Sequence, residues 1–263
     1  MKLATFTPPG SDTPTAGEIQ GEEVVAFGDG STVLQRIAAD DRSIASGDRY
    51  LLSEVQLLAP IPRPPMIYGI GLNYLSHAKE IGAEPPPAPI VFPKAPGCST
   101  APSGPVVKPA VIELLDYEAE LVVVIGRDSK VFGYAVADDV SARDLQKSEP
   151  HWVRAKGADT FCPWGPWITT ADEIDDVESL VVRGWVNGEQ RQEAPVSDLV
   201  HDIDSVIEFI GEAITLVPGD LILTGTPGGV GMAMDPRCFL EDGDVVRVEI
   251  DRLGSIEHPV VFG

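Results

Sequence analysis

The sequence predicts a strand-rich α+β fold, organised as a barrel or roll of short β-strands. From Met66 onward, short apolar runs alternate with Gly/Pro turns, a pattern typical of chains made of many short strands. Only residues 197–214 repeat their apolar side chains every three or four positions, as an amphipathic helix does. The length of 263 residues suits one large domain, or a small domain joined to a larger one.

The beginning of the chain is predicted to form a small N-terminal domain, residues 1–60. Residues 22–30 have the pattern of a strand that ends in a turn, and residues 31–40 that of a short helix with Ser31 as its N-cap. The stretch APIPRPP, residues 59–65, is the predicted linker, because proline lacks an amide donor and restricts the backbone. Residues 61–263 then form the larger domain.

Seven apolar runs in the larger domain are predicted strands, because each is short and is bounded by turn-forming residues. They occupy residues 66–72, 89–92, 120–126, 131–137, 179–188, 220–227 and 244–251.

Composition and charge exclude several classes of protein. No stretch approaches the roughly 18 apolar residues of a membrane span, and the N-terminus lacks the apolar segment of a secretory signal, so we expect a cytoplasmic protein without a membrane partner. The formal net charge of −22 argues against nucleic acid as a partner. The three cysteines are widely spaced and form no CxxC motif, so neither a disulfide framework nor a thiolate zinc site is expected.

Three acidic residues stand at the entrance of the most apolar run. Asp116, Glu118 and Glu120 alternate with other residues, so on one strand they would project from the same face. Buried neighbouring carboxylates repel one another unless a cation lies between them, and an all-oxygen ligand set suits Mg²⁺, Mn²⁺ or Ca²⁺ better than Zn²⁺. Spacing alone leaves a second interpretation open, a solvated edge strand whose acids face water.

A second acidic cluster follows the run at residues 131–137. Asp138 and Asp139 come where this strand should end, a position that suits either a metal ligand or a helix cap. The next residues are expected to start a helix, with Arg143 and Gln146 on one face at i and i+3.

A histidine and a glycine-rich loop complete the candidate chemistry. If residues 76–80 form a helical turn, His77 and Glu80 share a face and suit a base with its orienting carboxylate, although a plain surface pair would have the same spacing. Residues 222–231 are a strand followed by a glycine-rich loop without the GK[ST] ending of a phosphate-binding loop. Its backbone amides could approach an anion, and a simple structural turn is the alternative.

Six motifs in order and at matching spacing resemble the fumarylacetoacetate hydrolase (FAH) family over about residues 60–263. They are GLNYLSHAKE, DYEAELVVVIG, VADDVSARDLQ, RAKGADTFCPWGPW, GWVNGEQRQ and PGDLILTGTPGGVGM. The resemblance implies a mixed β-roll or barrel core with a small N-terminal domain, and assembly as a homodimer.

The resemblance also assigns roles to residues that match the family's motifs, and it leaves Asp116 and Asp138 outside the metal ligands. The implied metal ligands are Glu118, Glu120 and Asp139. The implied catalytic residues are His77, Glu80 and Lys156, with the first two on a lid that orders when a ligand binds. The implied substrate-binding residues are Arg143, Gln146, Thr226 and Lys94.

The resulting hypothesis is a divalent-metal-dependent hydrolase that cleaves a carbon–carbon bond in an acylpyruvate-type 2,4-dioxo acid. Mg²⁺ is the expected cofactor, with Mn²⁺ or Ca²⁺ as alternatives, and a small 2-oxo acid is the expected partner. The intact His–Glu pair favours hydrolysis. The alternatives are a 2-hydroxyhepta-2,4-diene-1,7-dioate isomerase, an oxaloacetate-type decarboxylase, and a non-catalytic dimer that binds a metal and a 2-oxo acid.

Overall fold

The computed structural model describes residues 1–263 as two packed open β-sheets with short helices at their edges, which confirms the predicted strand-rich α+β fold. The strands of the long sheet are β1 (Lys2–Thr7), β2 (Thr15–Gln20), β3 (Glu23–Ala26), β4 (Arg49–Leu51), β5 (Gln56–Leu58), β6 (Ile67–Gly71), β7 (Ile90–Lys94), β8 (Ser99–Thr100), β11 (Ala119–Ile125), β12 (Val131–Asp138), β14 (Cys162–Thr170) and β17 (Leu221–Leu223). The strands of the second sheet are β9 (Val106–Lys108), β15 (Val181–Val186), β16 (Glu189–Pro195), β18 (Val245–Ile250) and β19 (Gly254–Phe262).

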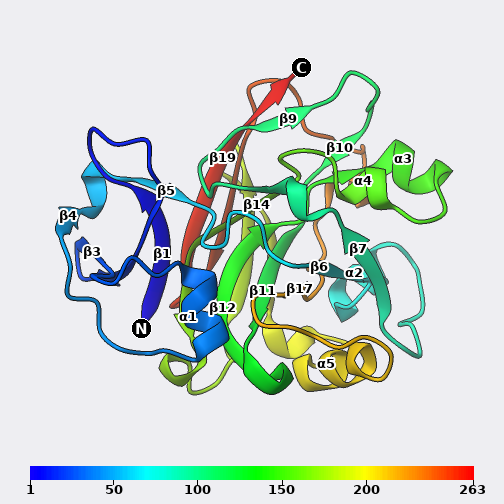
Figure 1. Ribbon diagram of the computed structural model, residues 1–263. Coiled ribbons are helices and arrows are strands. Elements are labelled where there is room, and N and C mark those ends of the chain that lie inside the picture. Colours follow the sequence, from blue (N-terminus) through cyan, green and yellow to red (C-terminus); the bar gives the residue numbers. More distant parts are fainter.

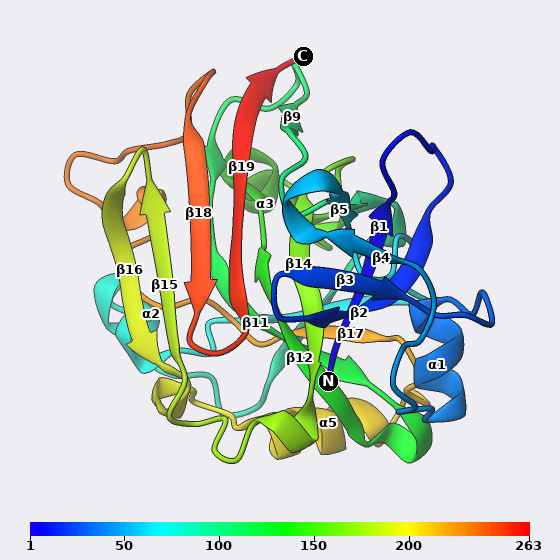
Figure 2. The ribbon, with the colours of Figure 1, turned by 90° about the vertical axis from the view of Figure 1, so that its left-hand side faces the viewer.

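The long sheet runs in the order β4-β3-β2-β1-β14-β12-β11-β17-β6-β7, with β5 added at β1 and β8 at β14. The second sheet has the order β16-β15-β18-β19-β9 and stands beside the centre of the first (Figure 2). A short ribbon of β10 (Leu115–Asp116) and β13 (Ser141–Ala142) lies outside both sheets. One cluster of 52 buried side chains draws on both sheets, so they share a core.

The helices are short and cover opposite sides of the molecule. They are α1 (Val33–Ala39), α2 (Leu75–Glu80), α3 (Arg143–Ser148), α4 (Val153–Lys156) and α5 (Ile203–Gly211). In Figure 1 the N-terminal strands and α1 lie on one side of the central strands β11 and β12, and α2, α3 and α4 lie on the other. No helix combines the length and the apolar character needed to cross a bilayer.

The predicted strands are all present, as β6, β7, β11, β12, β15, β17 and β18. β11 is buried along its whole length, as its continuous β-branched run indicates. The N-terminal strands extend the long sheet, because β1 pairs antiparallel with β14 and Leu3 belongs to the main core cluster. The domain boundary at residue 60 stays a prediction.

Two details of the helices differ from expectation. Helix α1 is capped by Thr32 rather than Ser31, because Thr32 and Gln35 satisfy each other's backbone amides in a capping box. The helix predicted over residues 197–214 begins at Ile203 and ends at Gly211, since the Asp202 side chain accepts the Ser205 amide and starts the helix there.

The expected line of acids on one strand is also interrupted. Asp116 belongs to β10, whereas Glu120 lies in β11, and the chain changes partner strands between them. Asp116 therefore points to a different neighbourhood from Glu118 and Glu120, as the site shows.

Candidate active site

Antiparallel pairing of β11 with β12 brings three carboxylates together. The register sets Ala119 opposite Asp138, and the Asp139 amide donates to the Glu118 carbonyl at 2.9 Å. Glu118, Glu120 and Asp139 each offer an oxygen, and these oxygens lie within 4.8 Å of one another. All three side chains are buried, so the interpretation as a water-facing edge strand does not hold.

The charges around the three carboxylates are unequal. Burial works against ionisation of Glu118, but the nearby Arg143 and Lys156 outweigh it and lower its pKa. Burial, together with the negative charges of Asp139 and Glu118, raises the pKa of Glu120 well above its ordinary value. Glu120 accepts the Gly225 amide at 2.7 Å and has no Lys or Arg within ion-pair distance.

This donor set fits a divalent metal ion. It is all oxygen, it is buried, and its three members converge, as hard cations such as Mg²⁺, Mn²⁺ and Ca²⁺ require. The negative charge of Glu120 has no cationic partner, and burial beside Asp139 and Glu118 disfavours it. A cation placed between the three carboxylates would therefore be favourable. Glu118, Glu120 and Asp139 are the residues that would hold the ion.

Two lysines support the carboxylate cluster from different sides. The Lys156 ammonium, from α4, bridges Glu118 and Asp139, with 2.8 Å to Asp139 Oδ2. Lys94, at the end of β7, contacts Asp139 and the carbonyl of Phe161 and is completely buried. Lys156 lines the cavity described below, whereas Lys94 lies behind Asp139 and does not line it.

Helix α2 brings the predicted histidine and glutamate into contact. His77 Nδ1 lies 2.6 Å from Glu80 Oε1, and Glu80 Oε2 accepts the Gly229 amide at 2.7 Å. Gly229 has φ +108°, and a Cβ there would lie 1.9 Å from the Arg191 carbonyl, so only glycine fits this position. The glycine-rich loop thus fixes Glu80, Glu80 fixes the imidazole, and Nε2 is left without a protein partner.

Helix α3 supplies the cationic side of the site. Arg143 Nη1 donates to Gln146 Oε1 at 2.9 Å, which confirms the expected i, i+3 face, and Arg143 Nη2 is 2.6 Å from Glu118 Oε1. Arg143 Nε donates to Asp116 Oδ2 at 2.8 Å. Asp116 also accepts the amides of Gly231 and Met232, so it joins the arginine to the glycine-rich loop.

These elements enclose one cavity of about 230 Å³. Its polar lining consists of His77, Glu118, Glu120, Arg143, Gln146, Lys156 and Thr226. Its apolar lining includes Ile70, Ile81, Ile90, Phe92, Trp152 and Met232. A base, two cations and two of the three clustered carboxylates therefore face one small space, which suits acid–base chemistry on an anionic molecule.

Several supporting residues escaped the sequence interpretation. Gln192 Nε2 donates to the Thr226 hydroxyl at 2.7 Å, and its Oε1 accepts the Ala119 amide. His258 Nε2 lies 3.0 Å from Asp138 Oδ2, and Asp138 Oδ1 accepts the Glu118 amide at 2.8 Å. Gln192 lies inside the quoted GWVNGEQRQ motif, which could have indicated it, but no local pattern marks His258.

Comparison with known proteins gives consistent matches. The family described as "Fumarylacetoacetate (FAA) hydrolase C-terminal" matches residues 66–261. A mitochondrial oxaloacetate tautomerase of Xenopus laevis, fahd2, is 42% identical over 234 residues, which cover 84% of this chain and 73% of the relative.

Two solved structures resemble the whole chain. The 2-hydroxyhepta-2,4-diene-1,7-dioate isomerase from Mycobacterium marinum has a TM-score of 0.83 at 35% identity, covering 100% of this chain and 98% of that one. The fumarylacetoacetate hydrolase from Exiguobacterium antarcticum has a TM-score of 0.89 at 33% identity and covers 100% of both chains.

Proposed function

The chain belongs to the fumarylacetoacetate hydrolase family of enzymes, and from that premise we propose that it is a metal-dependent tautomerase or isomerase of a small 2-oxo acid. The reaction moves a proton between carbon 3 and the oxygen on carbon 2, and so converts enol and keto forms. The observation that supports the proposal is that His77, held by Glu80, lines the same small cavity as Glu118 and Glu120 of the carboxylate cluster. The tautomerase and isomerase among the similar proteins support this choice over hydrolysis.

The size of the cavity favours a small substrate. Its volume of about 230 Å³ lies below the range of about 300–1,000 Å³ usual for drug-sized ligands. A four- or five-carbon 2-oxo diacid suits this space, and its negative charges suit Arg143 and Lys156.

The metal would be held by Glu118, Glu120 and Asp139, and when bound it supplies Lewis-acid polarisation of the 2-oxo group. We propose Mg²⁺ as this ion, with Mn²⁺ or Ca²⁺ as alternatives.

The side chains opposite the cluster move and hold the proton. In the keto-to-enol direction, His77 Nε2 accepts the proton from carbon 3 and delivers it to the oxygen on carbon 2, while Glu80 stabilises the positive imidazole that forms in between. Glu80 itself stays in place through the Gly229 amide. General base catalysis of this kind contributes about 10²- to 10⁴-fold.

The remaining polar residues bind and orient. Arg143 and Lys156 neutralise the substrate's charge, and Gln146 is fixed by Arg143 so that its amide group presents one orientation. Thr226 donates to the Ala119 carbonyl and accepts from Gln192, which holds its hydroxyl rigidly at the cavity wall. We propose that Lys94 acts by fixing Asp139 rather than by touching the substrate, because it lies behind that carboxylate.

Hydrolysis of an acylpyruvate is the second candidate. The similarity to the hydrolase from Exiguobacterium antarcticum favours it, since that structure has the higher TM-score of the two reported. In that reaction His77 would take its proton from water instead of from carbon 3, with the same support from Glu80.

The test is a substrate panel measured with Mg²⁺ or Mn²⁺: oxaloacetate, acylpyruvates and a hydroxydienedioate. We expect the enol absorbance of oxaloacetate to decay faster with enzyme, without formation of pyruvate or CO₂. Pyruvate together with a free acid would establish hydrolysis instead, and CO₂ would establish decarboxylation. The absence of all three changes, with metal bound, would leave a non-catalytic binding protein.

Matched variants tie the activity to the pair on α2. Glu80→Gln should lower the rate about tenfold to a hundredfold, less than the loss of the base itself would cost. Glu84→Gln alters an exposed glutamate in the loop after the same helix and should leave the rate unchanged. Equal rates in the two variants would contradict the role of Glu80.

A further inference from the structure

Two aromatic rings form one wall of the active-site cavity. The ring of Phe92, on β7, and the ring of Trp152, which precedes α4, meet edge to face with their centroids 5.5 Å apart. The Lys156 ammonium lies over the Phe92 ring, 5.1 Å from its centroid, and also contacts Glu118 and Asp139. The wall therefore runs from the carboxylate cluster through Lys156 and Phe92 to Trp152.

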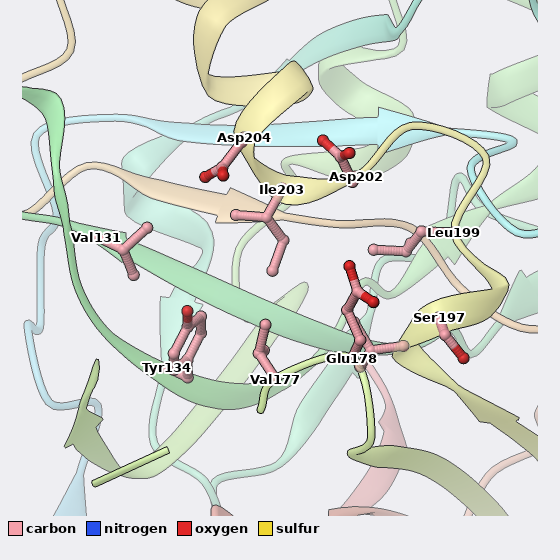
Figure 3. Close-up of a pocket in the computed structure, with 10 residues that line it drawn as sticks. Val131, Tyr134, Val177, Glu178, Ser197, Leu199, Asp202, Ile203 and Asp204 are labelled. Carbon is pink, nitrogen blue, oxygen red and sulfur yellow. The ribbon is translucent and has the colours of Figure 1, made fainter. Parts of the chain in front are cut away.

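Exposure increases along this wall, so Trp152 lies on the open side of the cavity. Lys156 and Phe92 are 2% and 4% exposed, Trp152 is half-buried, and Ile90, which also lines the cavity, is 38% exposed. A larger cavity of about 310 Å³ between β12 and the start of α5 (Figure 3) shares no lining residue with the active-site cavity and offers no inner extension of it. A substrate that outgrows the active-site cavity therefore extends toward the open side, where Trp152 lies.

The backbone of Trp152 is strained. It has φ 57° and ψ 4°, a left-handed conformation that glycine or asparagine adopts far more easily than a bulky residue. Its carbonyl accepts the Lys156 amide at 2.8 Å, but any residue would supply that carbonyl. Helix α4 thus needs the conformation and not the indole. Because such strain is typical of ligand-binding positions, the role of the indole lies in the cavity that it lines.

Two glycines of β6 back the aromatic wall. A Cβ at Gly69 would lie 2.2 Å from Phe92 Cζ, so the Phe92 ring occupies the space that a side chain there would fill. A Cβ at Gly71 would lie 3.6 Å from Trp152 Cζ3, which is ordinary packing distance. The indole therefore packs directly against β6 and Phe92, and it cannot move back from the cavity in either direction when a larger molecule enters.

We propose that Trp152 sets the size of the substrate, and that its indole excludes 2-oxo acids with a bulky group on carbon 3. This rests on the proposed function, in which the 2-oxo acid end binds at the carboxylate cluster and carbon 3 faces His77. The group on carbon 3 then extends away from the cluster, along the wall toward Trp152. The carboxylate that oxaloacetate carries there ends before the ring, whereas a phenyl group overlaps the ring.

The experiment compares oxaloacetate with phenylpyruvate on the full Mg²⁺-loaded chain, because the two differ only in the group on carbon 3. Decay of the enol absorbance gives kcat/KM for both. Calorimetry gives Kd for phenylpyruvate and for oxalate, a short and unreactive dianion, so that binding is measured without turnover. The wild type should prefer oxaloacetate at least about tenfold in kcat/KM, since excess bulk in a closed site costs that much or more.

In Trp152→Leu, kcat/KM for phenylpyruvate should rise and its Kd should fall, each at least about tenfold, while the values for oxaloacetate and oxalate change less than about threefold. Trp152→Gly, which suits the left-handed backbone, should give the same changes. Trp185→Leu removes a tryptophan from β15, outside the cavity, and should leave all four values unchanged. Circular dichroism confirms that each variant is folded.

Unchanged or weaker binding of phenylpyruvate in both Trp152 variants would overturn the proposal, because the indole would then be neutral or would itself bind the phenyl group. The turnover of oxaloacetate by the wild type tests the proposed function separately. If that turnover were absent while the Kd for phenylpyruvate fell as expected in the Trp152 variants, the tautomerase would be refuted and the size limit supported.

Discussion

Two buried carboxylates beside the active-site cavity hold its parts in position. Asp116 accepts hydrogen bonds from Arg143 Nε and from the backbone amides of Tyr117, Gly231 and Met232. Asp138 accepts the Glu118 amide and contacts His258. Neither lines the cavity, so each acts through a neighbour that does.

We expect Asp116→Asn to weaken both stability and activity. The asparagine side chain keeps the shape of aspartate but lacks the negative charge that pairs with Arg143. Its NH₂ group also replaces a carboxylate oxygen and would face N–H groups that need an acceptor. The free energy of unfolding should fall by about 1.5–3 kcal/mol, the usual worth of a hydrogen bond to a charged group, in urea denaturation. Asp159→Asn, on an exposed turn, should change it by less than about 0.5 kcal/mol. An unchanged kcat/KM in Asp116→Asn would contradict the link to Arg143.

The raised pKa of Glu120 leads to a prediction about pH. In the metal-free protein, burial and the charges of Asp139 and Glu118 raise this pKa above its ordinary 4.5. A carboxyl with a higher pKa in the folded state contributes stability that is complete below pH 4.5 and is lost as the pH rises through the folded-state pKa. The cost is about 1.4 kcal/mol for each pH unit by which the pKa is raised.

The free energy of unfolding of the metal-free wild-type protein should therefore decrease as the pH rises above about 4.5. Glu120→Gln should remove most of this pH dependence. With chelator at pH 8 the variant should be the more stable protein, in urea denaturation. Added Mg²⁺ should stabilise the wild type by about 2.7 kcal/mol at a hundred times its Kd and should have little effect on the variant. Glu113→Gln, an exposed neighbour, should follow the wild type. If the wild type were more stable than Glu120→Gln in chelator at pH 8, this would contradict the unfavourable charge of Glu120 in the metal-free cluster.

At the scale of single elements, capping residues decide where helices begin. In α1, Thr32 Oγ1 accepts the Gln35 amide at 3.2 Å, and Gln35 Oε1 accepts the Thr32 amide at 2.8 Å. Thr32→Ala should lower the free energy of unfolding by about 1 kcal/mol, because the Gln35 amide at the helix start loses its side-chain acceptor. Thr13→Ala, in an exposed turn and without a side-chain hydrogen bond, is the matched control in the same chemical denaturation experiment. Equal values for the two variants would contradict the capping box.

Local pattern predicted the elements that carry the chemistry. The β-branched run of β11 predicted a buried strand. The i, i+3 spacing predicted a shared helix face for His77 with Glu80 and for Arg143 with Gln146, and in the structure each pair is hydrogen-bonded. The motif resemblance, rather than spacing, selected Asp139 over Asp138 as the third carboxylate of the cluster.

Contacts between distant residues could not be predicted in this way. Asp116 meets Gly231, and Asp138 meets His258, across separations of 115 and 120 residues, and no periodicity relates such positions. The long helix was predicted too long for a related reason. Its apolar residues continue the helical period before Ile203, but Asp202 captures the Ser205 amide, and the residues before it form other turns.

At the scale of the whole molecule, the active site depends on segments that span most of the chain. Its residues run from His77 on α2 to Thr226 after β17, and β11 and β12 carry the metal cluster between them. The long sheet holds these segments in register, since β6, β17, β11 and β12 are successive neighbours in it. Strand pairing therefore sets the geometry of the site, and the short helices α2, α3 and α4 add its base and its cations.

The second sheet ends in an edge strand that carries exposed apolar side chains. β9 is its edge, and Val107 on β9 pairs in register with Val261 on β19, with both side chains exposed. Phe262, the next residue on β19, is also exposed, on the opposite face of the strand, where the Lys108 ammonium lies over its ring. An open edge strand with adjacent apolar side chains favours association with another chain. We therefore expect a homodimer in which this edge is covered, with Val107 and Val261 on one face of it and Phe262 on the other.

Light scattering after size exclusion should give a mass of about twice the 28.0 kDa of one chain. Val261→Lys should shift the protein toward the monomer, because a buried ammonium without a partner opposes association. Val217→Lys, at a similarly exposed valine after α5, should remain dimeric. A monomeric wild type would contradict the dimer itself. A dimeric Val261→Lys would instead contradict the placement of the interface at the β9 edge. The masses of the wild type and of Val261→Lys therefore test the dimer and the position of its interface separately.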